Sequence, residues 1–414
     1  MRPHKKFKAT PFPYHHELTL EVDSLSNLGI GVARVTLPDA EPDQGPWVVF
    51  VPFCLPGETV RARIYRNDSN CSHADLLEVV RPSPDRVEPR CFLFGSCGGC
   101  QYQHLSYSKQ LQWKRQQVEE LTVRLANLTI PVLEPIASPK EWNYRSKLTP
   151  HFDKPKNGEI GPIGFLAHGT RNRLVDVPQC PIAMEAITEA FPAVRKEAKE
   201  RASTFKKGVT LLLRAHQNGV ETNHRAVISE EVNGLTFHFL AGDFFQNNPS
   251  ILPAFVDYVA AEAAQDGCTH LVDAYCGSGL FALSLSSKFE QVAGVEVSES
   301  SADFARRNAE LNHLPHVQIL TSSAEGIFED ITFPAEQTAL VIDPPRKGCT
   351  PGFLEQLAQF GPKRVVYVSC NPATQMRDFV LLDEAGYQVE KIQPFDLFPH
   401  TKHLECVATL TRKP

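Results

Sequence analysis

The most constraining feature of this sequence is a regular alternation of apolar runs with helical segments, which begins at about Gly242 and continues to the C-terminus. Apolar strands that alternate with helices are typical of a doubly wound α/β fold with a mostly parallel sheet. The last two strands have no helix between them, which predicts an antiparallel edge. The predicted strands are Leu271–Tyr275, Gln291–Glu296, Val317–Leu320, Ala339–Asp343, Arg364–Ser369, Gln388–Gln393 and Glu405–Leu410.

The region before this alternation is organised differently. Five short strands between about Glu17 and Pro82, separated by Gly, Pro and Asp, predict a small β-barrel. Leucines and a valine at helical spacing then predict one amphipathic helix within 111–128. From about Pro131 to His238, strands mix with one helix near 184–201, which predicts an α+β region. We therefore expect a basic tail at 1–16, a barrel at 17–82, a central domain at 83–240 and an α/β domain at 241–414.

Composition excludes several classes of protein. No apolar run approaches the roughly 20 residues of a membrane span, and the basic N-terminus has no apolar stretch typical of a secretory signal. That N-terminus is either a solvated tail or an RNA-contacting arm. A net charge of −6 argues against wholesale coating of nucleic acid but allows local basic patches. Eleven cysteines without an export signal indicate a cytoplasmic chain with metal-binding or catalytic thiols.

The first motif is a strand, a turn and a helix in Leu271-Val-Asp-Ala-Tyr-Cys-Gly-Ser-Gly-Leu280. Gly277 and Gly279 allow a tight turn and close approach of a ligand to the backbone. Glu296 ends the next strand, where a carboxylate can accept hydrogen bonds from a ribose diol. This combination predicts a nucleoside-cofactor site.

The second motif is Asp343-Pro-Pro-Arg-Lys-Gly348, directly after an apolar strand. Each proline fixes φ and lacks an N–H donor, so the motif predicts a rigid turn. Such a turn lies at the carboxyl edge of the sheet, where α/β proteins bind ligands. An acid followed by two prolines is typical of methyltransferases that act on nucleic-acid bases.

The third motif places Cys370 between a strand and a helix opened by Asn371-Pro372. Pro372 suits the first helical turn, because its missing donor would have no partner there. A cysteine at a helix N-terminus experiences the positive end of the helix dipole, so we expect a lowered thiol pKa. Cysteine is also a common small buried residue, but its position beside the other two motifs favours a nucleophile.

Two further segments carry candidate chemistry. Near the C-terminus, two histidines precede Glu405, and a general-base role for Glu405 fits this segment better than a zinc site, which would lack ligands. Upstream, three clustered cysteines and one distant cysteine suit an iron–sulfur cluster better than structural zinc, which more often uses two separate C-x2-C pairs. These are Cys91, Cys97, Cys100 and Cys180; the other cysteines have no ligand spacing and are assigned to packing.

Together, these motifs resemble the RNA uridine-C5 methyltransferases, which make 5-methyluridine in ribosomal and transfer RNA. The most specific segments are Asp343–Gly348, Ser369-Cys-Asn-Pro-Ala-Thr374 and Phe398-Pro-His-Thr-Lys-His-Leu-Glu405, in this order. The N-terminal strands, with Leu55-Pro-Gly-Glu58, look like the OB-like RNA-binding barrel called TRAM. The four cysteines match the [4Fe-4S] ligands of the family.

The resemblance implies a Rossmann-like domain that binds S-adenosylmethionine, with Cys370 as nucleophile and Glu405 as base. Asn247 stands where relatives commonly carry an aliphatic residue, and Leu280 where some carry a polar one. If the contact at position 280 uses only the backbone amide, the second departure has little effect. The residues implied for the cofactor and uracil pocket are Gln246, Tyr275, Gly277, Gly279, Leu280, Glu296 and Asp343.

This reaction needs a cysteine nucleophile because C5 of uracil is too weak a nucleophile to accept a methyl group directly. Thiolate addition at C6 forms an enolate whose C5 can attack a sulfonium methyl group, and a base then removes the C5 hydrogen so that the cysteine is eliminated. The target uridine must also leave its stack to be reached.

The family implies a monomeric enzyme that acts on structured RNA. Members with both barrel and cluster mostly modify large-subunit ribosomal RNA, which favours 23S rRNA, with tRNA as the alternative. A non-catalytic RNA-binding iron–sulfur protein is disfavoured because Cys370, Asp343 and Glu405 all occur in order. Methylation of cytosine C5 or of adenine is disfavoured by Arg346 after the prolines and by the cysteine on the later strand.

Overall fold

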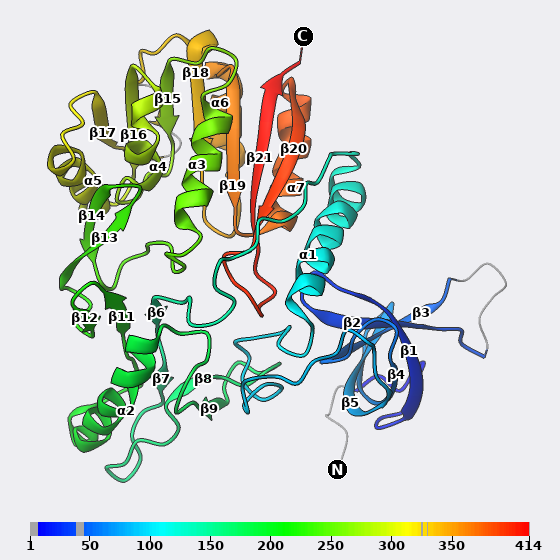
Figure 1. Cartoon of the computed structure of the whole chain (residues 1–414). Helices are drawn as coiled ribbons and strands as arrows, with labels where there is room; N and C mark the ends of the chain where they lie inside the picture. Colours follow the sequence, from blue (N-terminus) through cyan, green and yellow to red (C-terminus); the bar gives the residue numbers. More distant parts are fainter. Residues whose placement is uncertain (1–6, 39–44, 324–325, 329, 414) are drawn as a thin grey trace. The chain divides into compact units, whose positions relative to one another are not determined.

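The computed structural model describes residues 7–38, 45–323, 326–328 and 330–413, which form two compact units (Figure 1). The first unit is built from the described part of residues 1–117 with 166–173 and 400–402. The second comprises the described part of residues 118–165, 174–399 and 403–414. None of the helices in the described ranges has both the length and the apolar character needed to cross a membrane.

The first unit contains the predicted barrel. Its strands close in the order β1-β2-β3-β5-β4, with β3 and β5 parallel and the other neighbours antiparallel. Alternate side chains point inward and form the core, among them Val49, Val51 and Ala62. All five predicted strands are present: β1 (Glu17–Leu25), β2 (Ile30–Val35), β3 (Trp47–Pro52), β4 (Thr59–Asn67) and β5 (Cys71–Arg81).

The Leu-Pro-Gly-Glu segment joins the barrel to the chain that follows it. Glu58 is fully buried and accepts hydrogen bonds from the backbone N–H groups of Leu55 (2.8 Å) and Ser83 (3.2 Å). Its carboxylate also pairs with Arg86 at 2.5 Å. Burial by itself raises the pKa of Glu58, but the guanidinium and the backbone donors outweigh it and lower the pKa. This buried charge is therefore completely paired.

The N-terminal segment from Phe7 onward packs on the barrel. Phe12 belongs to the barrel core, and the Asn67 side-chain amide donates to the carbonyl oxygens of Lys8 and Phe12, both at 2.7 Å. A solvated tail is therefore wrong for residues 7–16. The rest of the predicted tail, Met1–Lys6, lies outside the described residues.

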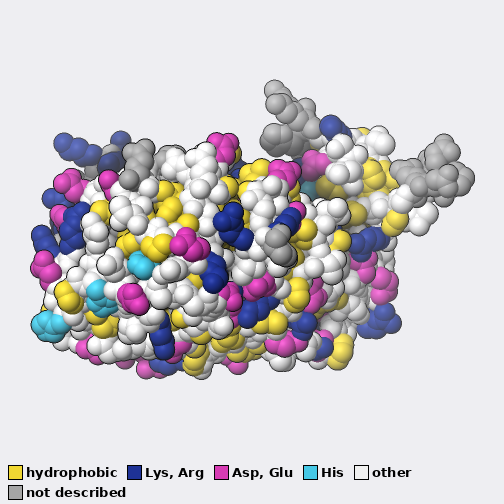
Figure 2. All heavy atoms as spheres, turned by 90° about the horizontal axis from the view of Figure 1, so that it is seen from above, with side chains coloured by type: hydrophobic (Ala, Val, Ile, Leu, Met, Phe, Trp, Pro, Cys, Tyr) yellow, Lys and Arg dark blue, Asp and Glu magenta, His cyan; other side chains and the backbone are white. Residues whose placement is uncertain are grey.

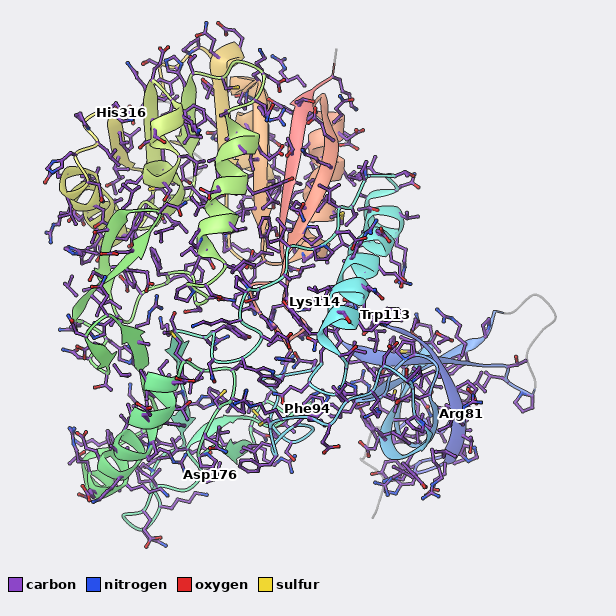
Figure 3. All side chains as sticks on the ribbon, viewed as in Figure 1. Arg81, Phe94, Trp113, Lys114, Asp176 and His316 are labelled. Carbon is purple, nitrogen blue, oxygen red and sulfur yellow. The ribbon has the colours of Figure 1, made fainter. Side chains whose placement is uncertain are left out.

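The predicted amphipathic helix is α1 (Tyr107–Leu121), followed by a π-helical turn, η1 (Thr122–Ala126). Trp113 and Lys114 lie on α1 (Figure 3). The Lys114 Nζ atom is 5.9 Å from the ring centre of Tyr102, and its side chain is buried. Asn127 ends the helical segment in the left-handed conformation, with φ of 55°.

The central part of the second unit contains three small sheets, in the orders β10-β7-β8-β9, β12-β11-β6 and β13-β14. Arg195 attaches α2 to the first of these sheets by donating to both carboxylate oxygens of Asp176 on β9 (2.8 Å each) and to the backbone carbonyls of Ile163 and Val177. Asp176 is labelled in Figure 3. The elements are β6 (Lys147–Leu148), β7 (His151–Phe152), β8 (Gly164–Leu166), β9 (Leu174–Asp176), α2 (Glu185–Glu200), η2 (Ala202–Thr204), β10 (Val209–Thr210), β11 (Leu213–His216), β12 (Gly219–Glu221), β13 (Val227–Val232) and β14 (Leu235–Leu240).

The predicted α/β domain forms a seven-stranded sheet in the order β17-β16-β15-β18-β19-β21-β20. Only β21 runs antiparallel to its neighbours, which confirms the predicted antiparallel edge. The strands are β15 (His270–Asp273), β16 (Gln291–Glu296), β17 (Val317–Thr321), β18 (Thr338–Ile342), β19 (Arg364–Ser369), β20 (Tyr387–Phe395) and β21 (Glu405–Arg412).

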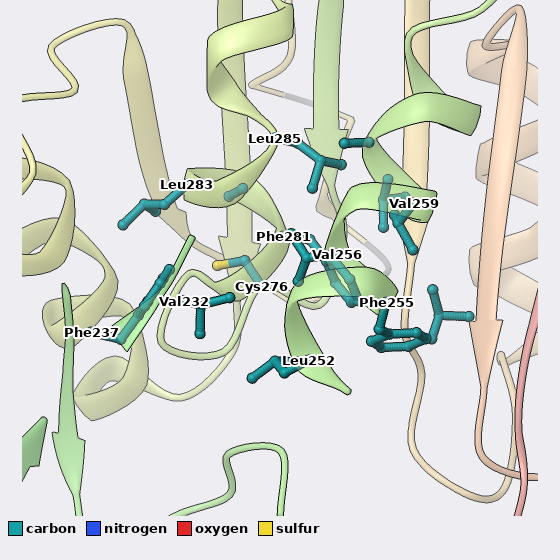
Figure 4. Packing of buried hydrophobic residues seen from close by; sticks show 14 of the residues in the cluster. Val232, Phe237, Leu252, Phe255, Val256, Val259, Cys276, Phe281, Leu283 and Leu285 are labelled. Atoms are coloured by element: carbon teal, nitrogen blue, oxygen red, sulfur yellow. The ribbon is translucent and has the colours of Figure 1, made fainter. Parts of the chain in front are cut away.

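Helices cover both faces of this sheet because its strands are apolar on both sides. Val341 packs with α3, α4 and α5 on one face, whereas its neighbours Leu340 and Ile342 pack with α6 and α7 on the other. Figure 4 shows the first face, where Phe255 and Phe281 lie among aliphatic side chains. The helices are α3 (Leu252–Ala263), α4 (Leu280–Ser284), η3 (Ser286–Lys288), α5 (Glu299–Leu311), η5 (Ala335–Gln337), α6 (Pro351–Phe360) and α7 (Pro372–Glu384).

Candidate active site

The glycine turn follows β15, the third strand of the sheet, at the point where the strand order reverses. Gly277 and Gly279 have φ of 54° and 96°, which L side chains rarely adopt. The Gly277 N–H donates to Glu296 at 3.0 Å, so the turn and the predicted ribose acceptor are joined directly. A side chain added at Gly277 would meet no atom within 4 Å, which leaves the space that a ligand needs.

Asp273, the last residue of β15, also belongs to this site, although we did not predict it. Its carboxylate is fully buried, and one oxygen accepts from the backbone N–H of Ala282 at 2.9 Å. The other oxygen is buried without a hydrogen-bond partner. Burial raises the pKa of Asp273 to about 7. Asp273 could have been predicted from the sequence, because an acid that ends the first apolar strand of the α/β domain lies four residues before Gly277.

The Asp-Pro-Pro loop follows β18, which neighbours β15 in the sheet. Asp343 is half-buried, and burial together with the Asp273 carboxyl raises its pKa to about 7. Helix α7 holds the loop, because Asn371 donates to the carbonyl of Arg346 (2.9 Å) and Arg377 donates to the carbonyl of Lys347 (3.0 Å).

The structure brings Cys370 and Glu405 together through strand pairing. In the antiparallel register of β19 and β21, Val368 lies opposite Val407 and Ser369 opposite Cys406. The next pair in this register is Cys370 and Glu405, so the predicted nucleophile and base lie opposite each other at the end of the sheet. Cys370 is half-buried and Glu405 is buried.

The pKa expected for Cys370 is wrong in direction. Burial and the carboxyls of Glu405 and Asp343 raise the pKa of the thiol to about 12, against a smaller lowering by Arg346. Burial and Asp343 likewise raise the pKa of Glu405 well above its usual range. Burial is the largest of these effects because it disfavours the thiolate, and the carboxyls add to it, so the helix N-terminus does not decide the pKa of this thiol. None of the three acids (Asp273, Asp343, Glu405) has a basic group within 4.0 Å among the described residues.

The loop with Gln246 connects β14 to α3. Gln246 is buried, and Asn248 fixes the loop by donating to the carbonyl of Leu397 at 3.0 Å, in the segment that leads to Glu405. Asn247, the first departure from the family pattern, accepts from Arg214 at 3.2 Å. Leu280, the second departure from the family pattern, packs against the apolar cluster on the sheet face that α3, α4 and α5 cover. Tyr275 packs on Phe353, with ring centres 5.5 Å apart.

Comparison with known proteins assigns the chain to a family. The family model described as tRNA (Uracil-5-)-methyltransferase matches residues 182–413. A tRNA (uracil(54)-C(5))-methyltransferase of Schizosaccharomyces pombe is 42% identical and covers 97% of this chain and 79% of its own. The chain belongs to this family. It is therefore an RNA (uracil-5-)-methyltransferase, as the resemblance implied.

Two further relatives agree with the family assignment. A tRNA (uracil(54)-C(5))-methyltransferase of Saccharomyces cerevisiae is 34% identical over 96% of this methyltransferase and 74% of its own chain. The crystal structure of Pyrococcus abyssi tRNA (uracil-54, C5)-methyltransferase in complex with S-adenosyl-L-homocysteine superposes with a TM-score of 0.70. That structure covers 95% of this chain and 100% of its own at 23% identity, so it shows a shared fold.

The cysteines predicted to bind a metal cluster lie in both units of this methyltransferase. Cys91, Cys97 and Cys100 belong to the first unit and Cys180 to the second. Burial and the nearby Cys91 raise the pKa of the Cys97 thiol. His400, from the C-terminal motif, is buried and accepts from the backbone N–H groups of Gln101 (3.0 Å) and Tyr102 (2.9 Å). Both hydrogen bonds are accepted by the backbone carbonyl oxygen of His400, so they fix the course of the chain at this residue.

The barrel contains a group that the sequence did not predict. Ligand atoms of Asp68, Cys71 and His73 lie within 4.8 Å of one another, although Cys71 was assigned to packing. The Arg66 guanidinium lies 2.7 Å from both Asp68 and His73, so a cation already occupies this group. Burial and Arg66 lower the pKa of His73.

Proposed function

We propose that this enzyme methylates C5 of a uridine in tRNA with S-adenosylmethionine, using Cys370 as nucleophile and Glu405 as base. The supporting observation is the antiparallel register that sets these two residues opposite each other beside Asp343. A thiol and a carboxyl on one side of a flipped uracil can serve C6 and C5, which are adjacent ring atoms.

The residues divide the reaction between them. Cys370 adds to C6 of uracil, and the electron pair of the ring double bond moves toward the carbonyl at C4 so that C5 becomes nucleophilic. After C5 has gained its methyl group, Glu405 takes the proton from C5, and the electrons of that bond re-form the double bond and expel the Cys370 sulfur.

The acidic edge of the sheet fits S-adenosylmethionine. The cofactor, when bound, supplies a methyl group on a positively charged sulfur. Glu296 beside the open Gly277 turn offers an acceptor for a ribose, and Asp273 has a buried oxygen without a partner. Asp343 and Glu405 add two further acids without a basic partner within 4.0 Å in the described structure. This donor set therefore favours a cationic ligand over a neutral one.

The same acids contribute to the unreactive state of the thiol. Burial and, to a smaller extent, the carboxyls of Glu405 and Asp343 hold the pKa of Cys370 high in the free protein. A positive charge beside them, from the cofactor, offsets this effect and favours the thiolate. The free enzyme is therefore protected from thiol oxidation, and nucleophile activation depends on occupancy of the cofactor site.

For the RNA, the relatives favour tRNA over the ribosomal RNA expected from the sequence. The named relatives from both yeasts are tRNA (uracil(54)-C(5))-methyltransferases, and they align over almost the whole of this chain. Methylation of 23S rRNA becomes the second candidate, because a barrel with clustered cysteines is also found in enzymes of that specificity.

The test uses the full chain, tritiated cofactor, and unmodified transcripts of tRNA and 23S rRNA. Cys370→Ala should abolish methyl transfer and the covalent adduct with 5-fluorouridine RNA, while cofactor still binds. The matched control is Cys268→Ala, a buried cysteine in the same unit that the mechanism does not use. Activity retained in Cys370→Ala contradicts the mechanism, and labelling of the rRNA alone contradicts the proposed substrate.

We also propose a [4Fe-4S] cluster bound by Cys91, Cys97, Cys100 and Cys180. The support is the sequence pattern and the proximity of Cys91 to the Cys97 thiol, whose pKa is raised by burial and, to a smaller extent, by Cys91. Protein purified without oxygen should contain iron and acid-labile sulfide, and Cys97→Ser should lose both. Cys71→Ser serves as control, and iron lost equally from both variants contradicts the assignment.

A further inference from the structure

One arginine in the second unit is buried without a counter-ion. Arg214 lies on β11 with a fully buried side chain, stacked 5.0 Å from the ring centre of Phe239. Among the described residues, the guanidinium donates one hydrogen bond, from Nη1 to the side-chain oxygen of Asn247 at 3.2 Å. The Nε and Nη2 atoms are buried and have no acceptor in the part of the chain that the structure describes. A guanidinium has five N–H donors, so most of its capacity is unused.

The residue opposite Arg214 makes this burial more costly. In the antiparallel register of β11 and β6, Arg214 faces Lys147, and like charges in directly opposed positions destabilise a sheet. Burial and Arg214 lower the pKa of Lys147 to about 8. Burial lowers the pKa of Arg214, and Arg145, a half-buried residue two positions before Lys147, adds a third positive charge that lowers it further.

The acids of this region do not neutralise the cluster. Glu221 lies opposite Arg214 on β12, but its carboxylate accepts from the backbone N–H groups of Thr222 (2.8 Å) and Asn223 (2.7 Å). Glu230 and Asp243 act on the cluster only through space. No carboxylate lies within 4.0 Å of Arg214 or Lys147 among the residues whose structure is described.

The cluster is attached to the loop that carries Gln246. The Lys147 ammonium donates to the carbonyl oxygens of Gly242 (2.6 Å) and Asp243 (2.8 Å) at the start of this loop, and Arg214 holds Asn247 within it. A buried, unpaired cation costs several kcal/mol in general, so its presence at one loop of the candidate site calls for an anionic partner.

We infer that Arg214 and Lys147 form a binding site for a phosphate group of the RNA substrate, next to the nucleotide that enters the active site. The inference rests on the proposed function. A phosphodiester supplies the acceptors that Nε and Nη2 lack, and arginine binds such oxygens in pairs. Because Asn247 covers Nη1, phosphate binding shifts the loop and thereby connects RNA binding to the position of Gln246.

On the face drawn in Figure 2, Lys and Arg side chains are interspersed with Asp and Glu side chains among the described residues. Where an exposed cation has an acid nearby, the acid and the solvent weaken its attraction for a phosphate. A buried, unneutralised arginine instead provides a specific anchor.

The first test separates a binding role from a structural one. Arg214→Met removes an unpaired charge and should leave the melting temperature of the free protein unchanged or raise it. The control Arg195→Met removes an arginine that donates to the Asp176 carboxylate and to two backbone carbonyls, so it should lower the melting temperature. An equal loss of stability in both variants overturns the inference.

The second test measures binding of an unmodified tRNA transcript over a series of salt concentrations. Arg214→Met should weaken binding about tenfold and make the dependence of log Kd on log salt shallower by about one unit, as expected for one lost phosphate contact. Arg214→Lys keeps the positive charge but not the planar guanidinium, so it should lose less affinity for the tRNA transcript. This variant also provides a test if Arg214→Met does not fold. The KM for RNA should rise in both Arg214 variants.

Two outcomes overturn the inference. One is an unchanged salt dependence in both Arg214 variants. The other is weaker binding of S-adenosylmethionine alone, measured by calorimetry, which would assign the site to the carboxylate of the cofactor. Failure of the proposed function has a different signature: the wild-type protein then transfers no methyl group, whereas RNA binding and its salt dependence remain measurable.

Discussion

Two regions of the second unit bury charge without counter-ions, and the charges have opposite sign. At the end of the large sheet, Asp273, Asp343 and Glu405 are acids without a basic group within 4.0 Å in the described structure. Beside the Gln246 loop, Arg214 and Lys147 are cations without an acid at that distance. Acids suit a sulfonium cofactor, and cations suit a phosphate. The difference in sign thus matches the two charged substrates that the proposed reaction requires.

The barrel shows the opposite arrangement. Its buried acid, Glu58, has an arginine and two backbone donors as partners. Where a buried charge only supports the fold, the protein supplies its partner. Where a ligand binds, the partner is left to the ligand, at a cost to the stability of the free protein. Variants of the paired and unpaired charges can test this distinction.

The largest expected effect is that of Glu405→Gln. Glutamine keeps the size of the side chain but cannot take the C5 proton, so methyl transfer should fall by roughly 10²–10⁴-fold. Since Cys370 is intact, the covalent enzyme–RNA adduct should accumulate and be visible as a shifted band on a denaturing gel. Loss of activity without any adduct would contradict the role of Glu405 as base.

A paired charge should be costly to disrupt. Arg86→Met leaves Glu58 buried with two backbone donors but no cation, and should destabilise the barrel by about 3 kcal/mol. Chemical denaturation followed by circular dichroism measures this. The exposed pair Arg201 and Glu197 provides the control, because Arg201→Met should change stability by less than about 1 kcal/mol. Equal losses of stability in Arg86→Met and Arg201→Met would show that the buried pair in the barrel contributes no more than an exposed pair.

An unpaired acid should respond in the reverse direction. Asp273→Asn can still accept from Ala282, so above pH 7 it should stabilise the free protein by about 1–3 kcal/mol and weaken cofactor binding. The sign follows from the raised pKa: the folded protein retains the proton, and this stabilising contribution is lost as pH rises through about 7. Destabilisation of the free protein by Asp273→Asn would show that this acid has a structural role.

The smallest expected effect is on the pH dependence of cofactor binding. Asp273 and Asp343 have pKa values near 7, so they lose negative charge as pH falls below that value. The affinity for S-adenosylmethionine should then fall by up to about tenfold per pH unit for each acid. S-adenosylhomocysteine, which lacks the sulfonium charge, is the matched control in calorimetry. The same pH dependence for both ligands would contradict a charge-based role for these acids.

The sequence alone determined where the strands lie along the chain and which candidate residues follow them. Apolar runs predicted β16 and β19 with the observed bounds, because strands covered on both faces carry an unmistakable pattern. Placement of the glycine turn, Asp343 and Cys370 at one edge followed, since parallel strands end on the same side. The resemblance to the methyltransferases added the roles of Cys370 and Glu405, which stay predictions.

Only the tertiary structure decided what surrounds these residues. The register of β19 and β21 sets Glu405 opposite Cys370, and burial together with the carboxyls gathered there raises a thiol pKa that local helix geometry would lower. The packing of β11 against β6 buried Arg214 without an acid, although nothing in the local sequence marks that arginine as unusual. Charge interactions depend on distance and solvent exposure, and both are set by segments far apart in the chain.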